Sequence, residues 1–466
     1  MSDVENQHTG SGDDDARTAY RDRFRVELDR HSTGFRADFV QLSDRLHATA
    51  PIAWTDTHGG YWFVNGNQEL FDVARRADVL SNDNDIRGER RGYWGVQIPP
   101  SPRDDGHQTI AGFLEMDPPV QRYYRNALNP YLSPAAIARW QPVQDEITRA
   151  CLDEVIGTGR IDVVDDLANV VPAVLTMAML GLPLESWTLY SEPIHAQVYM
   201  RPEDPDMARI QDLTMQMAMS LFGSVAEIRT TPRPGLIDAL IRADIGGRSP
   251  DDLEVVGAVL LLIGGGFDTT TALTAKSLEW LSQHPASRDR LIRDWDELRD
   301  SATEEFLRYF SPLQGDGRTV ARDAEIDGVR LAEGERLWLS FAMANRDAAV
   351  FEQPHAVELD RKGNRHASFG LGVHRCIGSN LARATFKTMV KAVLDRMPDF
   401  VCDPAGAVHY DSTGTINGMR HLPATFTPGE RRGPGLAETI ARLQRVVDEQ
   451  RLAEPVTTRP GRTQAG

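Results

Sequence analysis

Cysteine is scarce in this sequence, which has 466 residues but only three cysteines, Cys151, Cys376 and Cys402. Three thiols so far apart cannot form a disulfide framework, so we expect a reducing, cytoplasmic location. Long apolar runs are lacking too, because the longest covers only residues 255–263 and a membrane-spanning helix needs roughly 20 apolar residues. The polar first residues contain no apolar core of a signal peptide. We therefore expect no membrane association.

Basic residues are in the minority. There are 51 lysines and arginines against 68 aspartates and glutamates, which gives a formal net charge of −17. A protein that binds nucleic acid needs a concentrated basic face. The composition therefore excludes nucleic acid as a general partner.

No linker divides the chain, although its length would allow two or three domains. We expect a disordered acidic leader over residues 1–19 and a single domain over residues 20–425. Within that domain, residues 134–242 have an almost wholly helical pattern. Short apolar runs at 51–55 and 60–64 predict a β-hairpin. Together with a small sheet expected after residue 318, these patterns predict a fold that is mainly α with a small β-sheet region.

Residues 426–466 form a predicted C-terminal extension. Leu436, Ile440, Leu443 and Val447 recur at helical spacing, which predicts one amphipathic helix followed by a disordered tail. This helix can dock on its own domain or pair with a second chain, and two heptads are too few to claim a coiled coil. We expect a monomer, with a dimer through this helix as the alternative.

Residues 366–383, HASFGLGVHRCIGSNLAR, place Cys376 in a glycine-rich turn that leads into a helix. Glycine at this density indicates unusual backbone angles or close contact with a flat ligand. The helix N-terminus, together with His374 and Arg375, is expected to favour a thiolate, which is a soft ligand for iron. The alternative is that Cys376 is simply a small buried side chain.

A second stretch, residues 255–278, is an apolar helix with three consecutive glycines at its centre. Each glycine costs roughly 1 kcal/mol of helix stability relative to alanine, so the run needs a compensating reason. Close approach of a planar ring is one. Thr269 can return its hydroxyl to a backbone carbonyl and open the helix locally, and Asp268 beside it would make a proton relay. The alternative is a close helix crossing with Asp268 facing outward.

Two further helices carry polar pairs at helical spacing. Gln121 and Arg125 share one face of a helix that Pro130 is expected to limit. Glu305 and Arg308 share a face of a later helix, and an exposed pair of this kind contributes only tenths of a kcal/mol.

The order and spacing of Phe369, Gly372, His374, Cys376 and Gly378 resemble the thiolate-haem signature of the cytochrome P450 family. The glycine-bearing helix resembles the oxygen-activating helix of that family, with Gly265 where alanine is more usual. Glu305 and Arg308 resemble its buried ion pair. The same resemblance implies that Arg361 joins this pair and that all three residues have a structural role. Gln121 stands where the family more often has histidine.

This resemblance implies a cytochrome P450 fold, a triangular helical prism around a buried haem b. It implies that Cys376 is the iron ligand and that Asp268 and Thr269 deliver protons. Phe369 would pack near the sulfur, and Arg125, Arg318 and His374 would hold the haem propionates. The implied haem-binding residues are Gln121, Arg125, Gly265, Arg318, Phe369, Gly370, His374, Cys376 and Gly378.

The implied function is a haem-thiolate monooxygenase that uses dioxygen to hydroxylate a small lipophilic molecule such as a terpenoid, steroid or polyketide. No flavin or nicotinamide fingerprint is present, so electrons from NAD(P)H would arrive through a ferredoxin reductase and a ferredoxin. The expected docking patch for the ferredoxin comprises Arg122, Arg375, Arg383, Lys387 and Lys391. The alternatives are oxidative coupling, rearrangement or peroxygenation on the same fold, and a haem-thiolate sensor without turnover.

Overall fold

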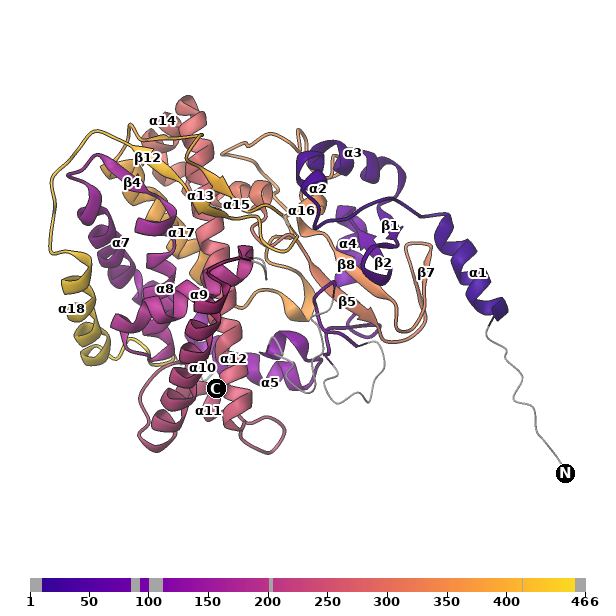
Figure 1. Ribbon diagram of the computed structural model, residues 1–466, viewed down its shortest axis with the longest axis horizontal. Helices are drawn as coiled ribbons and strands as arrows, with labels where there is room; N and C mark the ends of the chain where they lie inside the picture. The colour runs from indigo at the N-terminus through magenta and orange to yellow at the C-terminus, as the bar shows by residue number, and fades with distance from the viewer. Residues whose placement is uncertain (1–10, 85–92, 100–111, 201–203, 413, 457–466) are drawn as a thin grey trace, which may run out of the picture.

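The computed structural model describes residues 11–84, 93–99, 112–200, 204–412 and 414–456. A large helical body occupies one side of the molecule, and most of the strands gather on the other side with the first helices (Figure 1). This arrangement confirms the predicted fold class, mainly α with a small β-sheet region.

The helices follow one another along most of the chain. In order they are α1 (Ser11–Asp22), α2 (Thr33–Ala37), α3 (Phe39–Thr49), α4 (Asn67–Ala74), α5 (Val120–Leu132), α6 (Pro134–Arg139), α7 (Gln141–Val155), α8 (Val170–Leu180), α9 (Trp187–Tyr199), α10 (Met207–Thr230), α11 (Leu236–Ile241), α12 (Asp252–Gly266), α13 (Asp268–Gln283), α14 (Pro285–Arg293), α15 (Trp295–Phe310), α16 (Phe341–Ala344), α17 (Ser379–Arg396) and α18 (Leu436–Glu449).

The strands are short and form four sheets. They are β1 (Ile52–Thr55), β2 (Tyr61–Val64), β3 (Leu80–Ser81), β4 (Arg160–Asp162), β5 (Asp316–Val320), β6 (Ala324–Ile326), β7 (Val329–Leu331), β8 (Arg336–Leu339), β9 (Val401–Cys402), β10 (Val408–His409), β11 (Met419–His421) and β12 (Pro423–Thr425).

The largest sheet has five strands in the order β1-β2-β8-β5-β3. Strands β1 and β2 pair antiparallel, so the predicted hairpin is confirmed. Strand β8 runs parallel to β2 and antiparallel to β5, so it is the partner of the strand that contains Arg318. The tight turn at Asp327 joins β6 and β7, which pair with each other.

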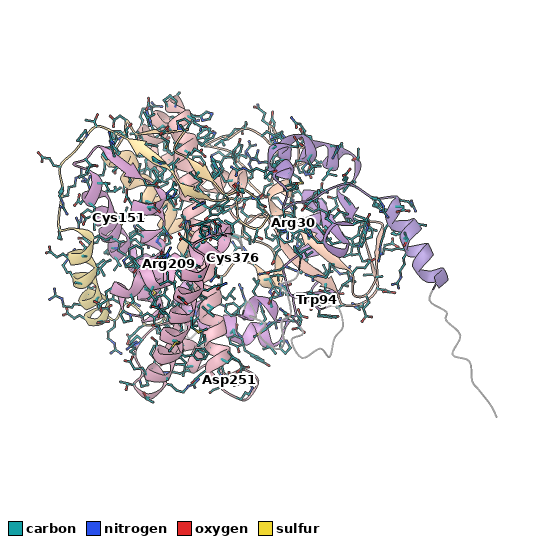
Figure 2. The ribbon with its side chains drawn as sticks, in the orientation of Figure 1. Arg30, Trp94, Cys151, Arg209, Asp251 and Cys376 are labelled. Atoms are coloured by element: carbon teal, nitrogen blue, oxygen red, sulfur yellow. The ribbon has the colours of Figure 1, made fainter. Side chains whose placement is uncertain are left out.

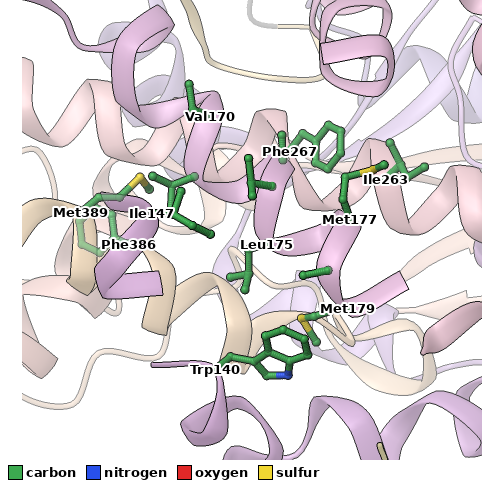
Figure 3. Close-up of a cluster of buried hydrophobic side chains, with 14 of the residues drawn as sticks. Trp140, Ile147, Val170, Leu175, Met177, Met179, Ile263, Phe267, Phe386 and Met389 are labelled. Carbon is green, nitrogen blue, oxygen red and sulfur yellow. The ribbon is translucent and has the colours of Figure 1, made fainter. Parts of the chain in front are cut away.

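The hydrophobic core lies in the helical body (Figure 3). Every residue of α8 is buried, which explains its lack of a polar face. Phe267, Met177 and Phe386 are among the core side chains drawn in Figure 3, and they come from the break between α12 and α13, from α8 and from α17. These helices therefore meet at the centre of the body.

The predicted apolar helix over residues 255–278 is longer than expected and is broken. Helix α12 ends at Gly266 and α13 begins at Asp268, with Phe267 at φ −86° and ψ −76° between them. A capping box formed by Asp251 and Glu254 fixes the start of α12. Residues Asp252–Gln283 are long and apolar enough to cross a membrane, and they are the only such stretch among the described residues. More than half of the most apolar window is buried inside the protein, as is usual for a core helix.

Helix α18 is present as predicted and packs against α7 of its own chain. Ile440, Leu443 and Val447 are buried in the main core. At the edge of this contact, Arg442 pairs with Glu146. The apolar face of α18 is thus covered from within the chain, which is the first of the two predicted arrangements of this helix.

The chain ends and one helix limit differ in part from the expectations. Residues 11–22 form helix α1, so the expectation of a leader that stays disordered to residue 19 is wrong from residue 11 onward. Pro130 lies inside α5 and does not end it, because the helix continues to Leu132. Residues 1–10 and the tail after residue 456 lie outside the described residues.

Glu305 and Arg308 are completely buried and form a bidentate ion pair in which both nitrogen–oxygen distances are 2.8 Å. Arg361 also donates to Glu305, at 3.0 Å. Arg308 donates further hydrogen bonds to the carbonyl oxygens of Asn345, Pro354 and Ala356. The pair is therefore not an exposed surface pair, and it ties α15 to the segment that leads into the cysteine turn.

Candidate functional site

The turn that carries Cys376 is held by its own backbone. The Cys376 amide donates to the Phe369 carbonyl at 2.7 Å. Gly370 and Gly372 have φ of 63° and 67°, a region that disfavours other residues. A Cβ on Gly372 would also lie 2.5 Å from the Ala74 carbonyl oxygen. Both glycines are therefore required by the turn, which delivers Cys376 just before α17.

Cys376 lies near the middle of the molecule (Figure 2), yet it is exposed. Its thiol must therefore face an internal space. The surrounding protein nevertheless desolvates the sulfur and so raises the pKa of Cys376. This effect outweighs the Gly378 amide and the charges of Arg125, Arg375 and Arg383, which lower the pKa. Our expectation that the turn by itself favours a thiolate is thus wrong. The deprotonated form needs a further positive charge at the sulfur, such as a metal ion.

Arg125, Arg318 and His374 come together beside this turn. Burial lowers the pKa of His374 to about 3, helped by the positive charges of Arg318 and Arg125. His374 therefore adds no positive charge beside Cys376, contrary to our expectation. Arg318 lies on β5, the strand predicted for it, and pairs with Asp316 at 2.8 Å. Because the guanidinium groups of Arg125 and Arg318 both act on His374, the three side chains together suit the binding of an anionic group.

Helix α5 is fastened to the cysteine turn by the two polar residues that the sequence singled out. Gln121 is buried, and its amide donates to the Val373 carbonyl at 2.7 Å. Arg125 donates to the Arg375 carbonyl at 2.8 Å. The two residues do share a face as predicted. The side-chain hydrogen bond of Gln121 is made to the backbone of the turn, so Gln121 supports the turn.

The glycine-bearing helix offers free space. A Cβ added to Gly264 or Gly265 would meet no atom within 4 Å, and Gly265 is exposed although its helix belongs to the core. The Thr269 hydroxyl donates to the Gly265 carbonyl at 2.8 Å, which confirms the predicted return to the backbone. Helix α13 packs against α17. The glycines end α12, from which α13 continues, and Cys376 lies in the turn just before α17. A planar ligand with a central soft metal and anionic edges, such as haem, fits this set of residues.

Asp268 is buried, so the alternative in which it faces outward is wrong. Its Oδ1 atom accepts from Nδ1 of His195 at 2.6 Å and from the hydroxyl of Tyr410 at 2.8 Å. Neither partner was singled out from the sequence. They lie 73 and 142 residues from Asp268 along the chain, so no local pattern could reveal them.

Arg383 on α17 contacts both Phe369 in the cysteine turn and Glu304 on α15. The Arg383 guanidinium lies 4.4 Å from the centroid of the Phe369 ring. Glu304 accepts two hydrogen bonds of 2.6 Å from Arg383 and one of 2.9 Å from His366. Burial would raise the pKa of Glu304, but these partners outweigh it and lower the pKa to about 2.

The Glu304 carboxylate is expected to make stability depend on pH. Because the folded pKa of about 2 lies below the ordinary 4.5, its contribution is complete above about pH 4.5 and is lost as the pH falls toward 2. Glu304→Gln should reduce the free energy of unfolding by about 1–3 kcal/mol at pH 7 and by less at pH 3. Urea unfolding at both pH values checks this. Glu297→Gln, on the exposed face of the same helix, is the control, and an equal loss at both pH values would contradict the prediction.

The known proteins that are similar to this chain include monooxygenases and proteins named cytochrome P450. The model of the family "Cytochrome P450" matches residues 186–401. A steroid C26-monooxygenase of Mycolicibacterium smegmatis is 28% identical over 411 residues, covering 83% of this chain and 90% of the relative. Linalool 8-monooxygenase of Pseudomonas putida is 27% identical and covers 82% of this chain and 94% of its own. The crystal structure of substrate-free CYP109E1 from Bacillus megaterium superposes with a TM-score of 0.73 at 29% identity, covering 84% of this chain and 100% of that one.

Proposed function

The chain belongs to the cytochrome P450 family and is a monooxygenase, and on this premise we propose that it hydroxylates a small lipophilic molecule of the steroid or terpenoid class. The observation that carries the proposal is the exposed thiol of Cys376 at the centre of the protein, beside a helix with free space at Gly264 and Gly265. The sensor alternative finds no support in the two relatives described above, because both are named as monooxygenases.

The haem, when bound, supplies the activation of dioxygen and the oxidation of the substrate. We propose that Cys376 ligates its iron through the thiolate. Arg125 and Arg318 would bind the propionates through charge-assisted hydrogen bonds, and His374 would donate to them as a neutral imidazole. Phe369, Gly370 and Gly378 shape the backbone around the sulfur, and Gln121 supports the same turn from α5.

Asp268 and Thr269 are proposed to move protons into the pocket. The Thr269 hydroxyl, bonded to the Gly265 carbonyl, holds a polar notch open in an otherwise apolar helix. Asp268 lies next in the chain and is held by two donors. A carboxylate in this position can pass protons inward from the solvent side while its helix excludes bulk water.

The substrate class is supported by what the relatives act on, as their names state: a steroid and linalool. A third relative is a vitamin D3 dihydroxylase of Streptomyces griseolus, 29% identical over 330 residues. Small apolar molecules with few polar groups suit the free space beside Gly264 and Gly265 of the apolar helix α12.

The test is turnover under ¹⁸O₂ of the haem-loaded protein with a ferredoxin, its reductase and NADPH, on a panel of steroids and terpenoids. One ¹⁸O atom in the product, with one NADPH consumed for each product formed, supports hydroxylation. A coupled or rearranged product without ¹⁸O would overturn it in favour of the coupling alternative. Turnover that hydrogen peroxide supports equally well without NADPH would favour a peroxygenase.

Electrons are proposed to come from NAD(P)H through a separate ferredoxin, on the side of α17. The expected basic patch is weaker than its sequence suggests, because three of its five cations have carboxylate partners: Arg383 pairs with Glu304, Lys387 with Asp300 and Lys391 with Asp395. Within the described residues no ion pair engages Arg122 or Arg375, and both are exposed. These two arginines are thus the best candidates for contacts with an acidic ferredoxin.

Arg122→Glu is expected to slow reduction by ferredoxin severalfold at low salt, because an exposed charge at the rim of an interface acts mainly on the association rate. The difference from wild type should shrink as salt is added. Stopped-flow reduction under carbon monoxide measures the rate. Arg330→Glu, in the β6–β7 hairpin, is the control and should leave the rate unchanged. Equal slowing in both variants would exclude a docking role for Arg122.

The cytoplasmic location of the protein stays a prediction from the sequence.

A further inference from the structure

Asp268 belongs to a buried cluster that joins three distant parts of the chain. Asp268 begins α13, His195 lies near the end of α9, and Tyr410 follows β10. All three are less than a tenth exposed. Oδ1 of Asp268 accepts hydrogen bonds from both His195 and Tyr410. The Tyr410 hydroxyl also lies 3.3 Å from Nδ1 of His195. Oδ2 of Asp268 is buried and has no hydrogen-bond partner among the described residues.

The two partners differ in what they can do. A carboxylate only accepts hydrogen bonds, so Nδ1 of His195 carries a hydrogen. Burial raises the pKa of Tyr410, and the negative charge of Asp268 raises it further. Tyr410 therefore stays protonated and can only hold the carboxylate. Imidazole is the side chain that exchanges protons near neutral pH, so of these two partners His195 is the one that can resupply Asp268.

The other charged and titratable groups around His195 leave this exchange possible. The centroid of the Tyr199 ring lies 5.4 Å from that of the imidazole, and the Arg420 guanidinium lies 4.4 Å from the centroid of the same Tyr199 ring. On η3 (Val164–Ala168), burial and the charge of Asp162 raise the pKa of Asp165, whereas His421 and His195 lower it. Asp165 therefore lies close enough to His195 for their charges to interact.

We propose that His195 is a positioning residue that hands protons to Asp268, while Tyr410 fixes the carboxylate in place. This inference rests on the proposed role of Asp268. The proton on Nδ1 of the imidazolium moves to Oδ1 of the carboxylate, which leaves a neutral imidazole and a neutral acid. Asp268 then releases the proton into the pocket, and His195 recovers one from water, so that proton and charge balance over the cycle.

Two variants test whether His195 supplies protons or only holds α9 against α13. His195→Asn keeps an N–H donor near the position of Nδ1 but cannot ionise. Tyr410→Phe removes a donor to the same oxygen without removing a group that exchanges protons. If His195 supplies protons, His195→Asn should lower kcat about tenfold or more, as loss of acid–base assistance does, with KM nearly unchanged. It should also increase the solvent isotope effect and flatten the pH profile of kcat. Tyr410→Phe should keep the wild-type pH profile.

A second measurement needs no turnover. In the reduced, carbon-monoxide-bound holoenzyme labelled with ¹³C-histidine, the resonance that disappears in His195→Asn identifies the His195 ring. In Asp268→Asn its titration midpoint should fall by about one to three pH units, because an adjacent carboxylate stabilises the imidazolium. An unchanged midpoint, or equal kinetic losses in the His195 and Tyr410 variants with unaltered pH profiles, would overturn the inference. Since this titration uses no substrate, its result is independent of whether the proposed hydroxylation is correct.

Discussion

Replacing Cys376 with alanine is expected to abolish monooxygenase activity and the strongly red-shifted absorption band of the reduced, carbon-monoxide-bound protein. The reason is local. Cys376 is the one exposed cysteine, whereas Cys151 and Cys402 are buried, and only a thiolate ligand gives this combination of spectrum and reactivity. The measurement is the difference spectrum of the reduced protein with and without carbon monoxide, followed by turnover on any substrate found in the panel.

The matched control for this experiment is Cys402→Ala. Cys402 pairs in a small sheet on β9 and donates its backbone amide to Ser282, an interaction that alanine preserves. This variant should keep the band and the activity. A red-shifted band that survives Cys376→Ala, or one that is lost equally in both variants, would remove Cys376 from the iron.

The sequence predicted those parts of the site that depend on residues close together in the chain. The cysteine turn needs its glycines within a few residues of Cys376, since Gly372 has no room for a side chain. The bond from Thr269 to the Gly265 carbonyl spans one helical turn. Such features depend on neighbours in the chain, so spacing alone reveals them.

The parts that the sequence did not predict depend on distant residues or on burial. His195 and Tyr410 reach Asp268 only in the folded chain. The pKa of Cys376 was misjudged because nearby arginines are visible in the sequence, whereas the larger effect of burial is not. The overestimated basic patch has the same cause, because Lys387 pairs with Asp300, which lies 87 residues away.

The largest loss of stability is expected from the buried ion pair on α15. Glu305→Ala leaves Arg308 and Arg361 charged and buried without their carboxylate. Removing one partner of a buried pair typically costs about 3–5 kcal/mol, because the remaining charge stays desolvated. We expect a loss of this size in the free energy of unfolding, measured by urea unfolding with the haem absorption as the signal.

The same helix provides the matched control for Glu305, because Asp296 and Arg299 form a pair of identical spacing in which both side chains are exposed. Exposed pairs contribute about 0–1 kcal/mol, so Arg299→Ala should change stability little. Spacing in the sequence is the same for both pairs, and burial alone distinguishes them. If both variants lost equally little, Glu305 would not lock the segment behind the cysteine turn. A large loss confined to Glu305→Ala shows that the charge network holds this segment in place, and with it the turn that presents Cys376.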